Sequence, residues 1–190
     1  MVDLGISSNF AGINRLSQQL AGALVVGVQE AAVEVQEIGR TEVVNWNAFD
    51  TYAIEESIYV SGYGYSDYED RANEAADALL NNPTNWPEIR QWRIDKGISP
   101  FLPLDPEQKV RSKYEAVVGV AATHGKYVES GYISWWYGNW VPARPFWRAT
   151  IDAARPKVIA IIWKNIHRVM QGQSGNGAGQ TGGTGGSTVP

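Results

Sequence analysis

The segment INRLSQQLAGALVVGVQEAAVEVQEI, residues 13–38, decides the fold of this chain. We expect it to lie in a helix from about Phe10 to Trp46, roughly 50 Å long at ~1.5 Å per residue. A domain of 190 residues does not cover such a helix alone, so part of it should contact something else. Gly39 is the expected point of a break. The apolar side chains recur every three or four residues, the stripe of an amphipathic helix: Ile13, Leu16, Leu20, Leu24, Val28, Ala31, Val35 and Ile38.

The chain after this helix predicts a strand followed by helices. Residues 54–60 contain strand-forming side chains before a Gly- and Tyr-rich turn. Ser66 and Glu69 fit a capping box, which predicts the start of a helix. A further short helix is expected over 85–97, with Pro in its first turn. We therefore expect residues 63–112 to form a helical insertion between two strands of one sheet.

The last third of the folded part predicts paired strands and a closing helix. Residues 116–122 alternate in the manner of a strand, and an extended pattern resumes at 127–128 after a turn, which predicts an antiparallel pair. Pro145 precedes an apolar helical pattern, and Pro156 lies inside it, where a kink or a restart is expected. The predicted fold is α+β: a small antiparallel sheet packed against a long N-terminal helix and a kinked C-terminal helix, with a helical insertion.

Composition excludes several classes of protein. The chain has no Cys, so disulfide frameworks, thiolate metal sites and cysteine nucleophiles are excluded. Its start lacks the pattern of a signal peptide, and its longest apolar run is too short to cross a membrane. We expect one folded domain over 1–170. Residues 171–190 hold eight Gly among Ser, Thr, Gln and Asn, and such a tail should be ordered only by partners.

Charge is divided unevenly along the chain. Residues 140–170 carry six basic side chains and one acid, a net +5, whereas residues 1–139 carry ten basic side chains and nineteen acids, a net −9. Unlike surfaces on one molecule favour head-to-tail contact between copies. A solvated basic helix would explain the same pattern, and specific DNA binding by this helix is disfavoured because its isoleucines predict burial.

Candidate catalytic and metal-binding residues are few. His124 and His167 have no Cys or carboxylate at ligand spacing, which argues against a zinc site. No nucleotide-binding loop and no serine-hydrolase elbow are present. Four acids could in principle form the carboxylate pair of a glycosidase, with the aromatic run at 132–140 as a sugar platform: Asp50, Glu55, Glu56 and Glu129. The alternative is that these acids are solvated or pair with Arg144 and Arg148, while the aromatics fill a core or an interface.

Five segments follow one another along the chain in a characteristic order. The long amphipathic helix comes first, followed by Asp50-Thr51 with Ser57-Ile58 and by Val118-Gly119-Val120. The two most specific segments are Tyr127-Val128-Glu129-Ser130-Gly131 and Ala143-Arg144-Pro145-Phe146-Trp147-Arg148-Ala149. In this order the segments resemble the tail-completion or neck protein family of long-tailed bacteriophages, and the resemblance covers about residues 10–60 and 115–170. The chain has Tyr52 where the family pattern has Gly.

The resemblance implies a structural role without catalytic residues, cofactors or metals. Such proteins form a ring, commonly sixfold, at the head–tail junction of the virion, and the genome passes through its lumen. The implied partners are copies of the chain itself, the head-closure or connector protein, and the tail terminator or tail tube protein; genomic DNA would pass without sequence-specific binding, and no membrane is involved. The implied location is the virion, with assembly in the host cytoplasm. A tail terminator that caps the tube is the alternative in this class, and a carbohydrate-binding domain is the alternative from another.

Within that interpretation, one group of residues should carry structure and contacts. Pro145 should set the entry angle of the closing helix, Phe146 should enter the core beside the first helix, and Arg144 should bond a carboxylate such as Glu129. The remaining candidates for structural or interface roles are Trp147, Arg148, Trp135, Trp136 and Trp140.

Overall fold

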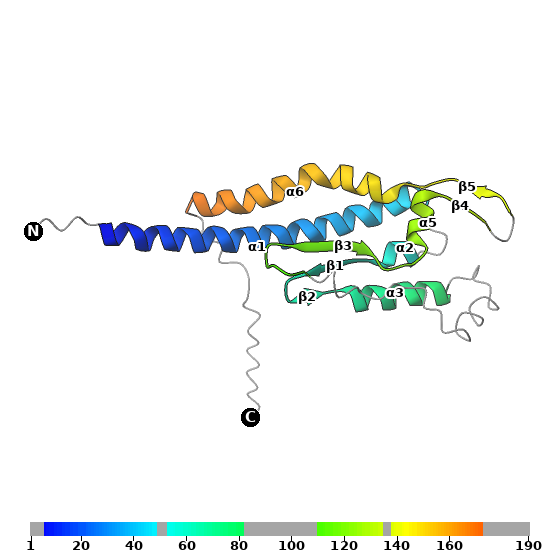
Figure 1. The fold of residues 1–190 in the computed structure, drawn as a ribbon, viewed down its shortest axis with the longest axis horizontal. Coiled ribbons are helices and arrows are strands. Elements are labelled where there is room, and N and C mark those ends of the chain that lie inside the picture. The colour runs from blue at the N-terminus through cyan, green and yellow to red at the C-terminus, as the bar shows by residue number, and fades with distance from the viewer. Residues whose placement is uncertain (1–5, 49–52, 82–109, 135–137, 173–190) are drawn as a thin grey trace, which may run out of the picture.

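The computed structural model describes residues 6–48, 53–81, 110–134 and 138–172. Two long helices, a small three-stranded sheet, a two-stranded hairpin and three shorter helices make up the described part, so the α+β prediction is confirmed. Figure 1 shows the order of the layers: helix α6 lies on α1, α1 lies on the sheet, and α3 covers the other side of the sheet.

Helix α1 (Ile6–Asn45) is the longest described element, and it packs antiparallel to α6 (Phe146–Met170). Close approach of the two helices depends on Gly27, where an added Cβ would lie 3.2 Å from the Cα of Ile162. The expected break at Gly39 is wrong, because α1 continues through it. An added Cβ at Gly39 would lie 3.3 Å from Ile58 Cδ1, so this glycine permits close packing on the sheet.

The sheet has the order β2-β1-β3 and is antiparallel throughout. Its strands are β1 (Ile58–Gly62), β2 (Tyr65–Ser66) and β3 (Ala116–Val120), with Val60 opposite Val118. Every residue of β1 is buried, as expected for a central strand covered on both faces. The segment between β1 and β3 contains helix α3 (Tyr68–Asn81) and also β2, so it is not wholly helical. The second helix expected there, at 85–97, lies outside the described residues.

Two expected strands are corrected by the structure. The start of the 54–60 segment forms helix α2 (Ala53–Glu56), where Ile54 is buried, and the strand begins only at Ile58. Residues 127–128 belong to helix α5 (Gly125–Ser130), in which the backbone N–H of Val128 donates to His124 O at 3.1 Å. Because Tyr127 is exposed and Val128 is buried, this dipeptide satisfies a strand pattern and a helical turn equally well.

The C-terminal part returns along α1 after a short hairpin. The hairpin pairs β4 (Tyr132–Ile133) with β5 (Trp140–Val141). Helix α6 then runs without interruption through Pro156, so the helix does not restart there, and Figure 1 shows it arching over α1. The core lies where α1, α2, β1, α5 and α6 meet, and its buried members are Val43, Ala48, Ile54, Ile58, Ala122, Val128 and Phe146.

Candidate assembly surfaces

The two most specific sequence segments are brought together at the junction of α5 and α6. The backbone N–H of Arg144 donates to Val128 O at 2.9 Å, which joins the entry of α6 to α5. The carboxylate of Glu129 accepts hydrogen bonds from the backbone N–H groups of Trp147 at 2.8 Å and Arg148 at 3.1 Å. Pro145 precedes the helix without a capping side chain of its own. Glu129 therefore supplies the cap for α6 from a different helix, where a negative charge also favours the helix dipole.

Arg144 makes a different contact from the expected one with Glu129. Its Nη1 donates to the backbone O of Asn47 at 2.6 Å, just after the end of α1 at Asn45. Asn47 has a positive φ of 49°, a conformation that Asn tolerates at helix ends. A cation at the C-terminal end of α1 is favourable for the helix dipole. Glu129 and Arg144 thus stabilise opposite helix ends and fix α1 and α6 to the same corner of the molecule.

Phe146 enters the core beside the first helix, as predicted. Its side chain is 1% exposed and lies in the buried cluster with Val43 and Ile54. The ring of Trp147 meets it edge-on, with centroids 6.5 Å apart, and covers the cluster from outside. This arrangement makes Phe146 the anchor of α6 at its first turn.

The hairpin carries the described part of the aromatic run. Trp140 is 62% exposed and Ile133 is also exposed, so neither side chain belongs to the core. Gly131 enters the hairpin at φ 78° and ψ 158°, a region open essentially to glycine alone. An added Cβ there would lie 2.7 Å from the Trp140 ring. Trp135 and Trp136 lie outside the described residues.

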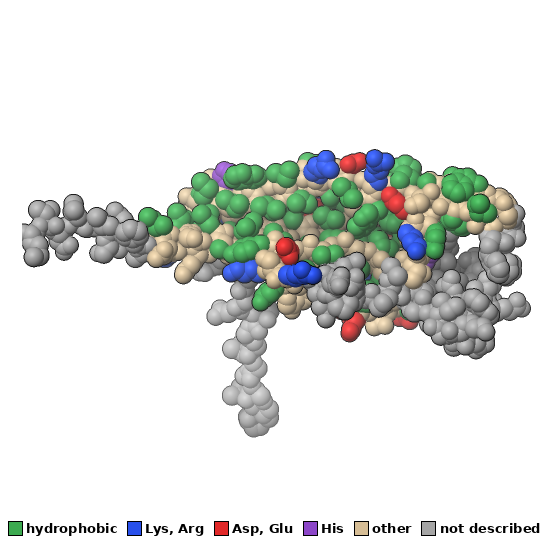
Figure 2. All heavy atoms as spheres, in the orientation of Figure 1, with side chains coloured by type: hydrophobic (Ala, Val, Ile, Leu, Met, Phe, Trp, Pro, Cys, Tyr) green, Lys and Arg blue, Asp and Glu red, His purple; other side chains and the backbone are tan. Residues whose placement is uncertain are grey.

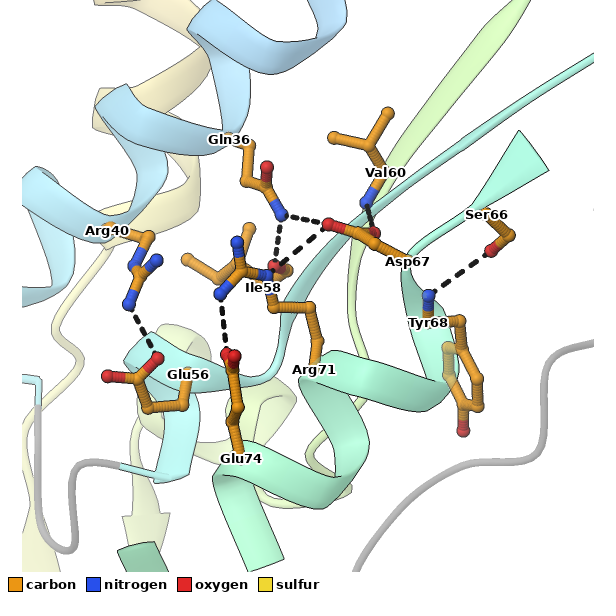
Figure 3. Close-up of polar contacts among 10 residues, drawn as sticks. All are labelled: Gln36, Arg40, Glu56, Ile58, Val60, Ser66, Asp67, Tyr68, Arg71 and Glu74. Atoms are coloured by element: carbon orange, nitrogen blue, oxygen red, sulfur yellow. Dashed lines mark hydrogen bonds and ion pairs between the residues drawn. The ribbon is translucent and has the colours of Figure 1, made fainter. Parts of the chain in front are cut away.

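A polar network outside the predicted site residues ties α3 to α1 and β1 (Figure 3). Gln36, buried on α1, donates from Nε2 to Ile58 O and to Asp67 Oδ2, both at 2.8 Å. Asp67 Oδ1 accepts the backbone N–H of Val60 at 2.6 Å, and Arg71 Nε donates to its other oxygen at 3.3 Å. At the predicted helix start, Ser66 Oγ accepts the backbone N–H of Tyr68 at 3.3 Å. The position of an Asp directly before a helix is the local signal that could have marked Asp67 as a structural residue.

Glu55 and Glu56, the other described acids of the predicted carboxylate group, lie on α2. Glu56 forms an ion pair with Arg40 at 2.5 Å, which links α2 to α1. Burial, then the neighbouring charge of Glu56, raises the pKa of Glu55, and the charge of Arg40 opposes that rise. Asp50 lies outside the described residues. No group of three or more potential metal ligands occurs within the described ranges.

Apolar side chains are exposed along both long helices. Figure 2 shows a mainly hydrophobic surface over α1 and α6, with charged side chains toward its edges. Figure 1 shows α1 extending past the C-terminal end of α6. In the N-terminal part of α1, Ile13 and Leu16 are exposed. None of the described helices is long and apolar enough to cross a membrane. Large contiguous apolar patches are typical of interaction surfaces. The further large exposed apolar side chains on the two helices are Val26, Val33, Val44, Ile151, Ile159, Trp163 and Met170.

Comparisons of this chain with protein-family models, with curated proteins and with solved structures found no match.

Proposed function

We propose that this chain is a structural virion protein of a tailed bacteriophage, which forms a ring with copies of itself at the head–tail junction. In this role it joins the head connector to the tail as a neck or tail-completion protein, and DNA passes through the lumen of the ring. It performs no reaction, and its free energy of assembly comes from contacts between subunits.

The observation that carries the proposal is the α5–α6 junction. The two segments with the most specific resemblance to the neck family, 127–131 and 143–149, are distant from the first helix in sequence, yet they meet at its end. There Glu129 caps α6, Arg144 bonds the backbone after α1, and Phe146 fills the core. The resemblance therefore coincides with one compact structural unit rather than with scattered positions.

The exposed helices give independent support for assembly. The α1 extension and the outer surface of α6 leave large apolar side chains in solvent, including Trp163 and Met170. Leaving such surface exposed is costly at roughly 25 cal/mol per Å² of apolar area, and a ring of identical subunits would bury it. A charge-divided molecule also favours contacts between unlike surfaces.

Particles made without this protein would test the proposal. In a phage whose copy of this gene carries an early stop codon, we expect electron micrographs to show DNA-filled heads and complete tails that remain unjoined. Supplying the purified full-length chain to such an extract should restore infectious particles. Tails of abnormal length would point instead to a tail terminator, and joined particles of normal infectivity would overturn the proposal.

A glycan-binding function would have a different signature. The exposed Trp140 on the hairpin is the feature that favours it. Under the proposed function, an array of immobilised glycans should retain the purified chain no better than its Trp140→Ala variant. Selective retention that disappears in this variant would favour the carbohydrate-binding alternative.

A further inference from the structure

Two exposed stripes of opposite charge run along the long helices. On α1, residues at steps of three and four form the first, which we call the acidic stripe: Val26, Glu30, Val33, Glu37, Thr41 and Val44. On α6, the same spacing gives the basic stripe: Arg148, Asp152, Arg155, Ile159, Trp163, Ile166 and Met170. The acidic stripe alternates apolar side chains with Glu30 and Glu37, a net charge of −2. The basic stripe has its charged side chains, two Arg and Asp152, in its N-terminal half, a net charge of +1, and apolar side chains in its C-terminal half.

The stripes lie on opposite sides of the helix pair. Lys157 of α6 bonds Glu34 of α1 at 2.8 Å, and Asn165 bonds Glu30 at 2.8 Å, so these contacts mark the side on which the acidic stripe lies. Positions two apart on a helix point about 200° apart at 3.6 residues per turn. Ile159, two residues after Lys157, therefore points to the other side. An acidic stripe and a basic stripe of one molecule cannot meet each other within that molecule.

Both stripes have exposed apolar side chains and charged side chains that are free for contact. Val33 is 49% exposed and Ile159 is 54% exposed. Within the described residues, no ion-pair partner is found for Glu37 or Arg155. Each stripe thus has apolar surface and unmatched charge that the other would complement.

We infer that the basic stripe of one copy docks on the acidic stripe of the next, and that this heterologous contact, repeated, closes the ring. The inference rests on the proposed function and names the surfaces that build the ring. Contacts between unlike patches generate rings, whereas a patch that pairs with itself generates a two-fold dimer. If α1 and α6 run along the ring axis, neighbouring subunits are related by a rotation about that axis without a shift along it. Residues at the same height along the axis therefore meet at the contact between subunits. Because Lys157 bonds Glu34, Val33, which precedes Glu34, and Ile159, two residues after Lys157, lie at nearly the same height along the axis.

Disulfide trapping tests this pairing directly, because the chain has no Cys of its own. Full-length chains carrying Val33→Cys or Ile159→Cys, with tags of different mass, are mixed and mildly oxidised. We expect the yield of the mixed dimer of Val33→Cys with Ile159→Cys to exceed the yield of either homodimer. It should also be about tenfold higher than the yield of the dimer of Ile159→Cys with the exposed control Lys113→Cys. Homodimers of Ile159→Cys in excess would show a two-fold dimer and overturn the inference, as would a mixed dimer no more abundant than the control.

Charge reversal provides a second, independent readout. Glu37→Arg and Arg155→Glu should each remove most of the ring peak in analytical ultracentrifugation, because one like-charge contact costs several kcal/mol and each ~1.4 kcal/mol is tenfold in association. Both substitutions in one chain should restore the ring, since every interface then regains an opposite pair. Circular dichroism melts check that each variant is folded.

The possible failures are distinguishable. If the unmodified chain forms rings that neither substitution weakens, the ring uses other surfaces, and only the assignment of the stripes is wrong. If the unmodified chain stays monomeric at every concentration, the stripes do not associate, and the proposed ring is contradicted with them.

Discussion

Removing the carboxylate of Glu129 should detach the start of α6 from α5. Glu129→Ala deletes the acceptor for two backbone N–H groups, those of Trp147 and Arg148, at 2.8 and 3.1 Å. Loss of an N-cap costs about 0.5–2 kcal/mol, and loss of a negative charge at a helix N-terminus costs a further ~0.3–1 kcal/mol. We expect the free energy of unfolding to fall by about 2 kcal/mol in total.

Thermal melts at fixed protein concentration measure this loss. For a chain of this size about 1 kcal/mol corresponds to ~2–4 °C, so Glu129→Ala should melt roughly 4–8 °C below the wild type. Glu129→Gln keeps one acceptor oxygen and loses the charge, so its melting temperature should fall by about half as much as that of Glu129→Ala. The matched control Glu115→Ala removes an exposed glutamate before β3 and should melt within ~1–2 °C of the wild type.

Salt separates the two contributions. At ~1 M ionic strength the screening length falls to ~3 Å, so the stabilisation that comes from the charge of Glu129 should decrease. The difference in melting temperature between Glu129→Gln and the wild type should therefore become smaller. The hydrogen-bond part should persist in Glu129→Ala. A melting temperature of Glu129→Ala equal to that of the wild type would refute the assignment of Glu129 as the cap of α6.

Three other substitutions have expected outcomes of different kinds. Phe146→Ala should lower the free energy of unfolding in urea by about 3–5 kcal/mol through a core cavity, and an unchanged midpoint would count against its placement. Gly131→Ala should cost ~1–3 kcal/mol from its backbone conformation, seen as faster amide exchange in the hairpin. Glu55→Gln should raise the free energy of unfolding at pH 7. The pKa of Glu55 is raised in the folded state, so its ionisation lowers stability as the pH rises through that pKa. Gln does not ionise, and the variant avoids this loss. The advantage should vanish below pH 4.5, the ordinary pKa of the side chain, and an advantage that persisted there would have another cause.

The long elements could be predicted because their signal extends over many residues. The three-to-four spacing over 13–38 specifies α1, and the burial of Phe146 follows from an apolar side chain just inside a helix entered through Pro145. Short elements give too few periods to distinguish a helix from a strand. Val128 and Ile54 are both buried, yet the turns around them are helical because tertiary packing outweighs local propensity.

The partners of polar side chains could not be predicted for a different reason. The sequence predicts that Arg144 bonds a carboxylate such as Glu129, because the two carry opposite charges. Both instead bond backbone groups at helix ends, which local sequence does not bring near them. Likewise, Gln36 and Asp67 are 31 positions apart in the chain and meet only because α1 covers the sheet beside α3. Such contacts depend on the assembled fold.

The central claim is that sister copies complete this subunit. Native mass spectrometry of the full-length chain, with electron microscopy of the same sample, tests it most directly. We expect a single closed assembly of identical subunits, most simply a hexamer, seen as a ring with an open channel. A monomer that persists across all protein concentrations, with Trp163 fluorescence characteristic of solvent in a variant retaining only that tryptophan, would contradict it.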